Sequence, residues 1–188
     1  MRAILPRLLV VLLVTVPFSL ALADDYDDTI KVFRNAGQSG KFFGSSYGYA
    51  VFPTIGKGGI GIGGAHGSGR VYEKGVHVGD TSMTQVTVGL QLGGQAFSQI
   101  IFFQDKRAFD EFTSGNFEFG AQASAVAITA GAQAQAGTAG TGAGASGTQS
   151  HADTVGGYQK GMAIFTVAKG GLMYEASIGG QKFSYKKK

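Results

Sequence analysis

The stretch from residue 56 to residue 70, GKGGIGIGGAHGSGR, constrains the fold most, because eight of its fifteen residues are glycine. Residues 59–64 alone hold four glycines, a density that excludes a stable helix. Ile60 and Ile62 alternate with glycine, which is the period of a β-strand. We therefore predict a strand in which both isoleucines pack inward and the glycines permit tight curvature.

The same stretch contains the letter pattern of a dinucleotide-binding loop at Gly56, Gly58 and Gly61. That pattern binds a pyrophosphate only where a strand turns into a helix, whose N-terminus receives the phosphates. A strand period follows here instead, and a chain with 32 glycines produces the pattern by chance. We expect no nucleotide binding.

Most of the remaining chain also has strand character. The segment YGYAVFP predicts a short strand ended by Pro53, and the glycines favour a hairpin around residues 65–69. Further strands are predicted over residues 76–103 with a turn near Gly93 and Gly94, over 117–135, and over 157–188 with turns at 169–171 and 179–180. Short glycine turns imply antiparallel pairing. The predicted fold is mainly β within the α+β class: a strongly curved or nearly closed antiparallel sheet.

Two segments have helical spacing. Ile30, Phe33 and Ala36 predict one N-terminal helix over residues 26–43, weakened by two glycines and packed on the domain. A short inserted helix follows Asp105, which can cap it. Its stripe consists of Ala108, Phe109 and Phe112, and Gly115 ends it.

The N-terminus has the layout of a cleavable signal peptide over residues 1–23. Two arginines precede an apolar run from Leu8 to Leu20, and a small-x-small site predicts cleavage after Ala23. An uncleaved anchor is the alternative. We expect an exported, periplasmic protein with a single domain over residues 24–188. Residues 137–150, GTAGTGAGASGTQS, predict a mobile loop.

No catalytic constellation emerges from the sequence. The chain has no cysteine, and its histidines, His66, His77 and His151, lack partners at metal-ligand spacing. The carboxylates nearest the predicted core are Asp105, Asp110, Glu111 and Glu118, of which three belong to the short helix. We predict a protein that is not an enzyme and has no metal site, no cofactor and no nucleic-acid partner.

Three separated segments resemble the SYLF domain, also called the Ysc84-type domain. They are YGYAVFPTIGKGGIGIGGAHGSGRVYEKG, LQLGGQAFSQIIFFQDKRAFDEFTSG and GLMYEASIGGQKFSY, in the order that the family shows. The resemblance spans about residues 30 to 185. It implies a non-enzymatic lipid-binding module whose eukaryotic relatives are associated with phosphoinositide membranes and actin. An exported protein has no access to the actin of its own cell, so we expect lipid binding rather than actin binding to carry over to this protein.

The expected contacts with anionic phospholipid headgroups are lysines. The resemblance indicates Lys57 after VFP, Lys169 before the G-L-M motif and Lys182 in the final strand, and the charged end of the chain adds Lys186, Lys187 and Lys188. From Thr29 onward the sequence carries 14 basic and 8 acidic residues, a balance that suits an anionic surface. Each lysine can equally be a solvated strand end. The alternatives are a structural or partner-binding envelope protein, with an unknown protein partner, and a small outer-membrane β-barrel.

Overall fold

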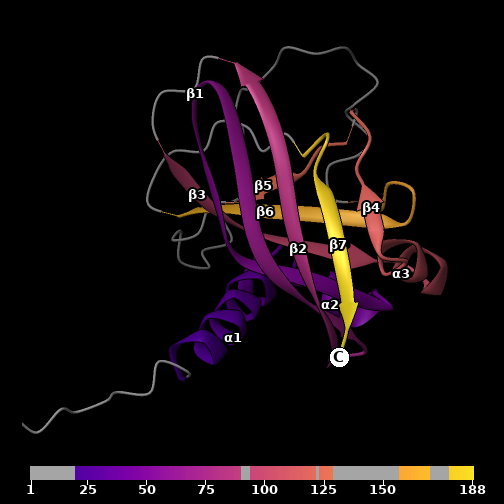
Figure 1. The fold of residues 1–188 in the computed structure, drawn as a ribbon. Coiled ribbons are helices and arrows are strands. Elements are labelled where there is room, and N and C mark those ends of the chain that lie inside the picture. Colours follow the sequence, from indigo (N-terminus) through magenta and orange to yellow (C-terminus); the bar gives the residue numbers. More distant parts are fainter. Residues whose placement is uncertain (1–19, 90–93, 122, 129–156, 170–177) are drawn as a thin grey trace, which may run out of the picture.

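The computed structural model describes residues 20–89, 94–121, 123–128, 157–169 and 178–188 (Figure 1). The elements in chain order are α1 (Leu20–Asn35), α2 (Phe42–Ser45), β1 (Gly48–Glu73), β2 (Val76–Gly89), β3 (Gln95–Phe103), α3 (Lys106–Phe112), β4 (Asn116–Glu118), β5 (Val126–Ile128), β6 (Met162–Lys169) and β7 (Lys182–Lys187). The loop predicted at 137–150 and most of the predicted signal peptide lie outside the described residues. The predicted cleavage point after Ala23 falls within α1.

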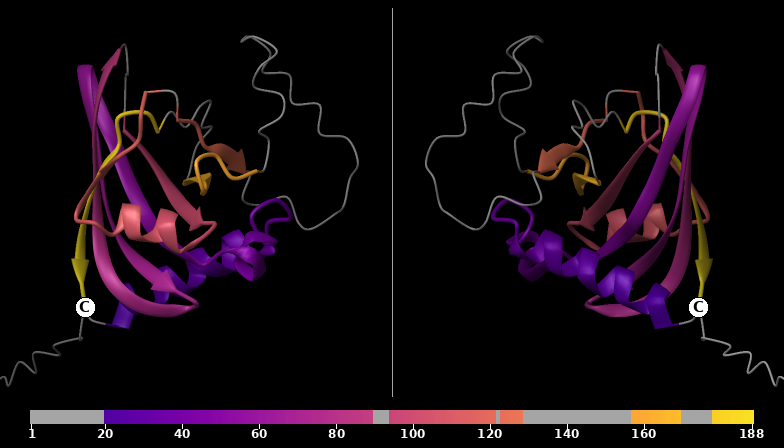
Figure 2. Two further views of the ribbon diagram at one scale, coloured as in Figure 1. Left: turned by 90° about the vertical axis from the view of Figure 1, so that its right-hand side faces the viewer. Right: turned by 90° about the vertical axis from the view of Figure 1, so that its left-hand side faces the viewer.

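The described strands form one open sheet of seven strands, in the order β4-β7-β2-β1-β3-β6-β5. Every pair is antiparallel except β5–β6, which is parallel. The long strands curve around α3 (Figure 2). The two edge strands, β4 and β5, follow each other in sequence, so residues 119–125 lead from one edge of the sheet to the other. Eight residue steps span at most about 28 Å, which keeps the edges near each other. The prediction of a mainly β, strongly curved sheet is confirmed.

Strand β1 is one bent strand rather than the predicted short strand and hairpin. Its first part pairs with β3 and its second part with β2. The strand bends near Gly59, whose φ of +151° favours glycine. The first part passes so close to the second that a Cβ on Gly67 would lie 2.6 Å from Ile55 Cγ1 and 2.8 Å from the Thr54 carbonyl oxygen. The glycines therefore make room for backbone against backbone, as expected for tight curvature.

Two predictions about β1 are wrong. Pro53 does not end the strand, because it lies at the register shift between Phe52 and Ile55, where a missing N–H costs no regular ladder bond. The hairpin turn lies at Lys74 and Gly75 instead of residues 65–69.

Both faces of the sheet carry apolar clusters. The inner cluster includes Phe52, Phe103 and Phe183 and receives Phe109 and Phe112 from α3. The outer cluster includes Tyr49, Phe102 and Phe165, and α1 and α2 cover it with Phe33 and Phe42. Phe33 is fully buried, as its place on the predicted helical stripe implies.

The helices match the prediction in part. Asp105 caps α3 by accepting a hydrogen bond from the Ala108 backbone N–H at 2.9 Å, and the predicted stripe of α3 is buried. The N-terminal segment forms two helices instead of one, because α1 ends at Asn35 and a turn through residues 36–41 precedes α2. Glycine in that turn is necessary, since a Cβ on Gly40 would lie 2.4 Å from the Arg34 carbonyl oxygen.

The extended run predicted over residues 117–135 is also wrong in its described part. Only β4 and β5 are strands there, and the described residues between them, 119–121 and 123–125, are mostly irregular. Phe119 fixes this connection through two backbone bonds: its N–H donates to the Gln181 carbonyl at 3.0 Å, and its carbonyl accepts from Gly180 at 2.9 Å. Gln181 is held in turn by a reciprocal amide pair with Gln99, at 2.9 and 3.2 Å, and both side chains are fully buried. The turn predicted at 179–180 is confirmed, with Gly180 at a φ of +76°.

Candidate functional site

One end of the sheet gathers the bend of β1, the end of β2, the start of β3 and the end of β6. Register places these segments together, because Gly61 pairs with Gly89, Lys57 with Gln95, and Ala96 with Lys169. We call this the bend end and define it as residues 56–64, 84–89, 95–97 and 167–169. Those residues include lysines but no Asp or Glu. We call the opposite end, around the Lys74–Gly75 turn and residues 186–188, the turn end; the C-terminus lies there (Figure 1).

The bend end exposes two large aliphatic side chains. Ile62 is 71% exposed and Val86 is 77% exposed. Gly64 pairs with Val86 and Ile62 with Val88, so Ile62 and Val86 are diagonal neighbours on the same face of the sheet. The prediction that Ile62 packs inward is therefore wrong, and the side chain of Ile60 lies outside the described set.

The residues opposite Ile62 explain its outward direction. Along this part of β1 the odd-numbered positions face the inner cluster, where Ala65 and Val71 are buried. Gly67 and Gly69 occupy the same face, because the first part of β1 crosses there and leaves no room for side chains. Ile62 therefore falls on the outer face, beside solvent.

The structure brings two of the predicted lysines to the bend end. Lys57 is half-buried and, by strand alternation, on the inner side with Ile55. Lys169 is on the outer side with Val167, donates from Nζ to Thr54 Oγ1 at 2.8 Å, and lies 3.9 Å from Asp25 Oδ1. Two cations therefore reach this end from opposite faces of the sheet.

Of the other predicted lysines, Lys182 borders the bend end on β7, because it pairs in register with Thr84, and the three C-terminal lysines lie away from that end. Lys182 faces Glu118 with its Nζ 3.6 Å from Oε2, and Lys186 pairs in register with Asp80. Lys187 and Lys188 continue to the turn end, about 16 and 20 Å from Lys182 at roughly 3.3 Å per residue. The six lysines thus form no single basic patch.

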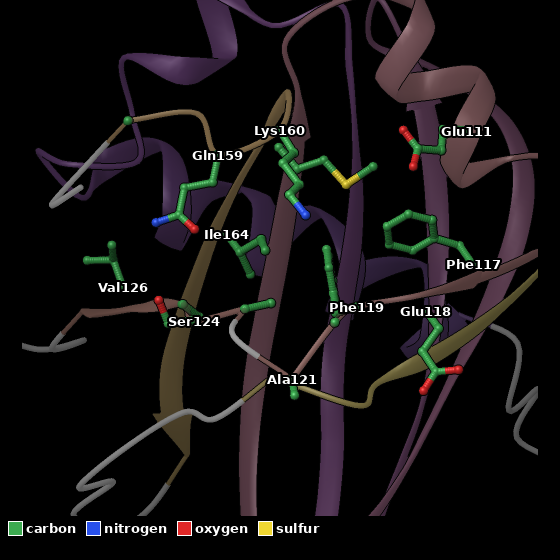
Figure 3. Close-up of a pocket in the computed structure, with 15 residues that line it drawn as sticks. Glu111, Phe117, Glu118, Phe119, Ala121, Ser124, Val126, Gln159, Lys160 and Ile164 are labelled. Carbon is green, nitrogen blue, oxygen red and sulfur yellow. The ribbon is translucent and has the colours of Figure 1, made fainter. Parts of the chain in front are cut away.

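A separate pocket of about 550 Å³ lies between α3, the start of β6 and residues 117–121 and 123–126 (Figure 3). Its apolar lining is formed by Phe117, Phe119, Val126, Met162 and Ile164. Lys160, Glu111 and Glu118 bring charges to it, and Figure 3 shows the Lys160 side chain directed toward the pocket above Phe119. The volume lies in the usual range of small-molecule sites, roughly 300–1,000 Å³.

The titratable groups that the structure buries serve packing. Burial raises the pKa of Tyr26, Tyr49 and Tyr72, so these phenols stay neutral near pH 7 and supply no base. The Arg70 guanidinium carbon lies 4.1 Å from the centre of the Tyr26 ring and ties α1 to β1.

Metal chemistry finds no support in the described residues. Among them, no three His, Cys, Asp or Glu side chains converge so as to hold a metal ion. His66 is exposed, and His77 lies 3.0 Å from Asp80 as an isolated pair; His151 is outside the described residues. The part of the chain that the structure describes also contains no helix with the length and apolar character needed to cross a membrane.

Comparison with known proteins identifies the family. The family described as "Ysc84: Las17-binding protein actin regulator" matches residues 84–188, more than half of the chain. The protein belongs to the Ysc84, or SYLF, family. This family consists of non-enzymatic binding domains associated with lipid and actin. The resemblance noted in the sequence is thereby confirmed.

A curated relative extends the match toward the N-terminus. It is "Beta cell expansion factor A" of Aeromonas veronii, 28% identical over 158 residues, which cover 82% of this chain and 51% of that protein. The chain therefore spans about half the length of this SYLF-family relative.

Sequence reasoning missed Ile62 and Val86 as exposed residues, and it missed Lys160. On β2 the buried Gln85 is adjacent to Val86, so the polar residue is inside and the apolar residue outside, against the usual pattern. For Lys160 a signal was present, because Lys160–Gly161 repeats the dipeptide Lys74–Gly75. Both lysines have a positive φ, near 50°, in two-residue turns.

Proposed function

We propose that this SYLF protein is a lipid-binding module of the cell envelope that contacts anionic phospholipid with the bend end of its sheet. The observation that carries the proposal is the pair of exposed aliphatic side chains, Ile62 and Val86, at an end where Lys57 and Lys169 also lie. Family membership supports a binding role associated with lipid or actin.

The chemistry of a membrane interface suits this arrangement. Aliphatic side chains gain roughly 25 cal/mol for each Å² that they remove from water, and a lysine near an anionic surface contributes about 1 kcal/mol. Ile62 and Val86 would enter the acyl region while Lys57 and Lys169 remain at the level of the phosphates. A monomer normally buries such side chains or displays them singly, so an adjacent pair favours an interaction role.

Co-sedimentation with vesicles tests the proposal. The protein with residues 24–188 should pellet with vesicles containing anionic phospholipid at low salt, pellet much less at 0.5 M salt, and remain in solution with purely zwitterionic vesicles. Equal recovery in solution with both kinds of vesicle at low salt would refute it.

Export through the predicted signal peptide is part of the same proposal. The expected mature protein begins at Asp24, and N-terminal sequencing of protein from the periplasmic fraction measures this directly. Recovery of the protein in the cytoplasm with residues 1–23 attached would contradict export.

The description of the family, an actin regulator that binds Las17, makes actin the second candidate partner. An exported protein meets no actin of its own cell, which favours lipid. Sedimentation with actin filaments separates the two, because a protein that pellets with filaments and ignores vesicles acts as an actin-binding module.

A further inference from the structure

The pocket of Figure 3 has a rigid wall that carries one cation. Gln159 and Met162 exchange two backbone hydrogen bonds of 2.9 Å, which close a two-residue turn around Lys160 and Gly161. Both turn residues have a positive φ, 50° and 84°. Lysine adopts this conformation unfavourably, so the surrounding structure must hold the turn in place.

Helix α3 provides that support. A Cβ on Gly161 would lie 2.6 Å from Arg107 Nη2 and 3.0 Å from Ala108 Cβ, so the turn packs directly on the helix. Arg107 also donates from Nη2 to the Lys160 carbonyl at 3.4 Å. The backbone of Lys160 is therefore fixed relative to the pocket, and only its side chain is free to move.

The charges around the pocket leave Lys160 unbalanced. Glu111 Oε2 accepts from Arg107 Nη1 at 3.2 Å, and Glu118 Oε2 lies 3.6 Å from Lys182 Nζ. Each carboxylate therefore has its own cation. Lys160 has no ion pair within the described part of the chain. An ammonium without a counterion that faces an apolar cavity is suited to a ligand with two parts: an anionic group that the ammonium binds and an apolar group that enters the cavity.

The apolar part of the pocket suits one alkyl chain. Phe119 is 7% exposed and fixed by its backbone bonds to Gln181 and Gly180, and Met162 is 4% exposed. Ile164 and Val126, on adjacent strands β6 and β5, lie across the cavity from the glutamates (Figure 3). Small alanines at positions 121, 123 and 125 leave the space between these walls open.

We propose that this pocket binds a single-chain anionic amphiphile, with the carboxylate or phosphate at the Lys160 ammonium and the alkyl chain between Phe119, Ile164 and Val126. This ligand site is distinct from the membrane contact at the bend end. It can be occupied by a soluble amphiphile whether or not Ile62 and Val86 insert into a bilayer.

Titration calorimetry below the critical micelle concentration tests the site, with dodecanoate, dodecyl phosphate and dodecanol as probes. Both anions should bind with one-to-one stoichiometry, and dodecanol at least fivefold more weakly. Methyl spectra of the isoleucine-labelled protein give the location: dodecanoate should shift the signal of Ile164 and leave that of Ile62 in place.

Three variants sharpen the test, and the first two form a matched pair. Lys160→Asn keeps a residue that tolerates the positive φ and removes the ammonium, so dodecanoate should bind at least fivefold more weakly while dodecanol is unaffected. Lys74→Asn makes the same change in the other Lys-Gly turn and should leave both affinities unchanged. Ala123→Phe fills the cavity and should weaken all three probes.

The proposal is overturned if neither anion binds, if Lys160→Asn and Lys74→Asn behave alike, or if the anions shift Ile62 and not Ile164. Vesicle binding by wild type serves as the separate readout of the proposed membrane function. A protein that pellets with anionic vesicles but binds no dodecanoate refutes the pocket alone.

Discussion

The two ends of the β1–β2 pair each expose aliphatic side chains, yet their surroundings differ. At the turn end Val76 is 64% exposed, and its register partner is Glu73, with His77 and Asp80 close behind in β2. At the bend end Ile62 and Val86 are adjacent on one face, and the strand residues around them carry lysines but no carboxylate. A single exposed valine among charges is ordinary for a protein surface, whereas an apolar pair beside cations is suited to an anionic membrane.

The lysines at and beside the bend end also differ from one another. Lys57 forms no ion pair within the described residues, whereas Lys169 lies 3.9 Å from Asp25 and Lys182, which pairs in register with Thr84, lies 3.6 Å from Glu118. An exposed ion pair contributes little to stability, but its carboxylate offsets the positive field that a headgroup would meet. Position relative to carboxylates therefore separates Lys57 from Lys169 and Lys182.

Strand β1 connects the two ends, and a substitution that disturbs its close self-crossing should have the largest effect on the free energy of unfolding. Gly67→Ala would place a Cβ 2.6 Å from Ile55 Cγ1, so we expect the free energy of unfolding to fall by about 1–3 kcal/mol. Gly64→Ala is the matched control, since its Cβ would lie 3.5 Å from the Gln85 carbonyl oxygen, an ordinary contact. Urea denaturation of both variants measures the difference, and equal stability would show that the two parts of β1 are not in close contact.

Negative charges at Ile62 and Val86 should remove the apolar surface that distinguishes the bend end from the turn end. Ile62→Asp combined with Val86→Asp should lower the affinity for anionic vesicles by at least about tenfold, or 1.4 kcal/mol, because neither carboxylate can enter the acyl region. Val76→Asp should change it by less than about twofold. Both proteins should melt within about 2 °C of wild type, since all three positions are exposed. A comparable loss in Val76→Asp would mean that net charge alone governs binding.

Removal of one lysine should have a smaller effect. Lys57→Gln should weaken binding to anionic vesicles about fivefold at low salt, near 1 kcal/mol, and the difference should vanish at high salt. Lys182→Gln should lower affinity by less than about twofold, because Glu118 already offsets its charge. If the two variants are equally weakened, the ion pair does not matter for binding.

The general architecture could be predicted because it follows from local signals. Residue spacing predicts the capped helix α3 and the strand character of β2, β3 and β6. The glycine content predicts the strong curvature. The path of β1 could not be predicted, because Pro53 ends a regular strand but is tolerated at a bulge, and whether a bulge occurs depends on β3. The Lys74–Gly75 turn was hidden by the many glycines before it.

The candidate site was predictable only in part, because its decisive features depend on distant residues. The alternation of side chains along a strand shows that Ile62 shares a face with its even-numbered neighbours. It does not show which of the two faces is buried. Here the crowded inner face holds glycine, so the rule that apolar side chains point inward fails. The pairing of Lys182 with Glu118 and the pocket beside Lys160 likewise join segments that lie far apart in the sequence.

The most direct test of the membrane contact uses the fact that the chain contains no cysteine. Ile62→Cys and Val76→Cys each create a unique thiol for an environment-sensitive fluorophore, one at each end of the β1–β2 pair. On addition of anionic vesicles, the label at residue 62 should shift to shorter wavelength and be quenched by brominated acyl chains, while the label at residue 76 should stay in water. Insertion of the label at residue 76, or of neither label in vesicles that the protein demonstrably binds, would contradict a membrane contact through the bend end.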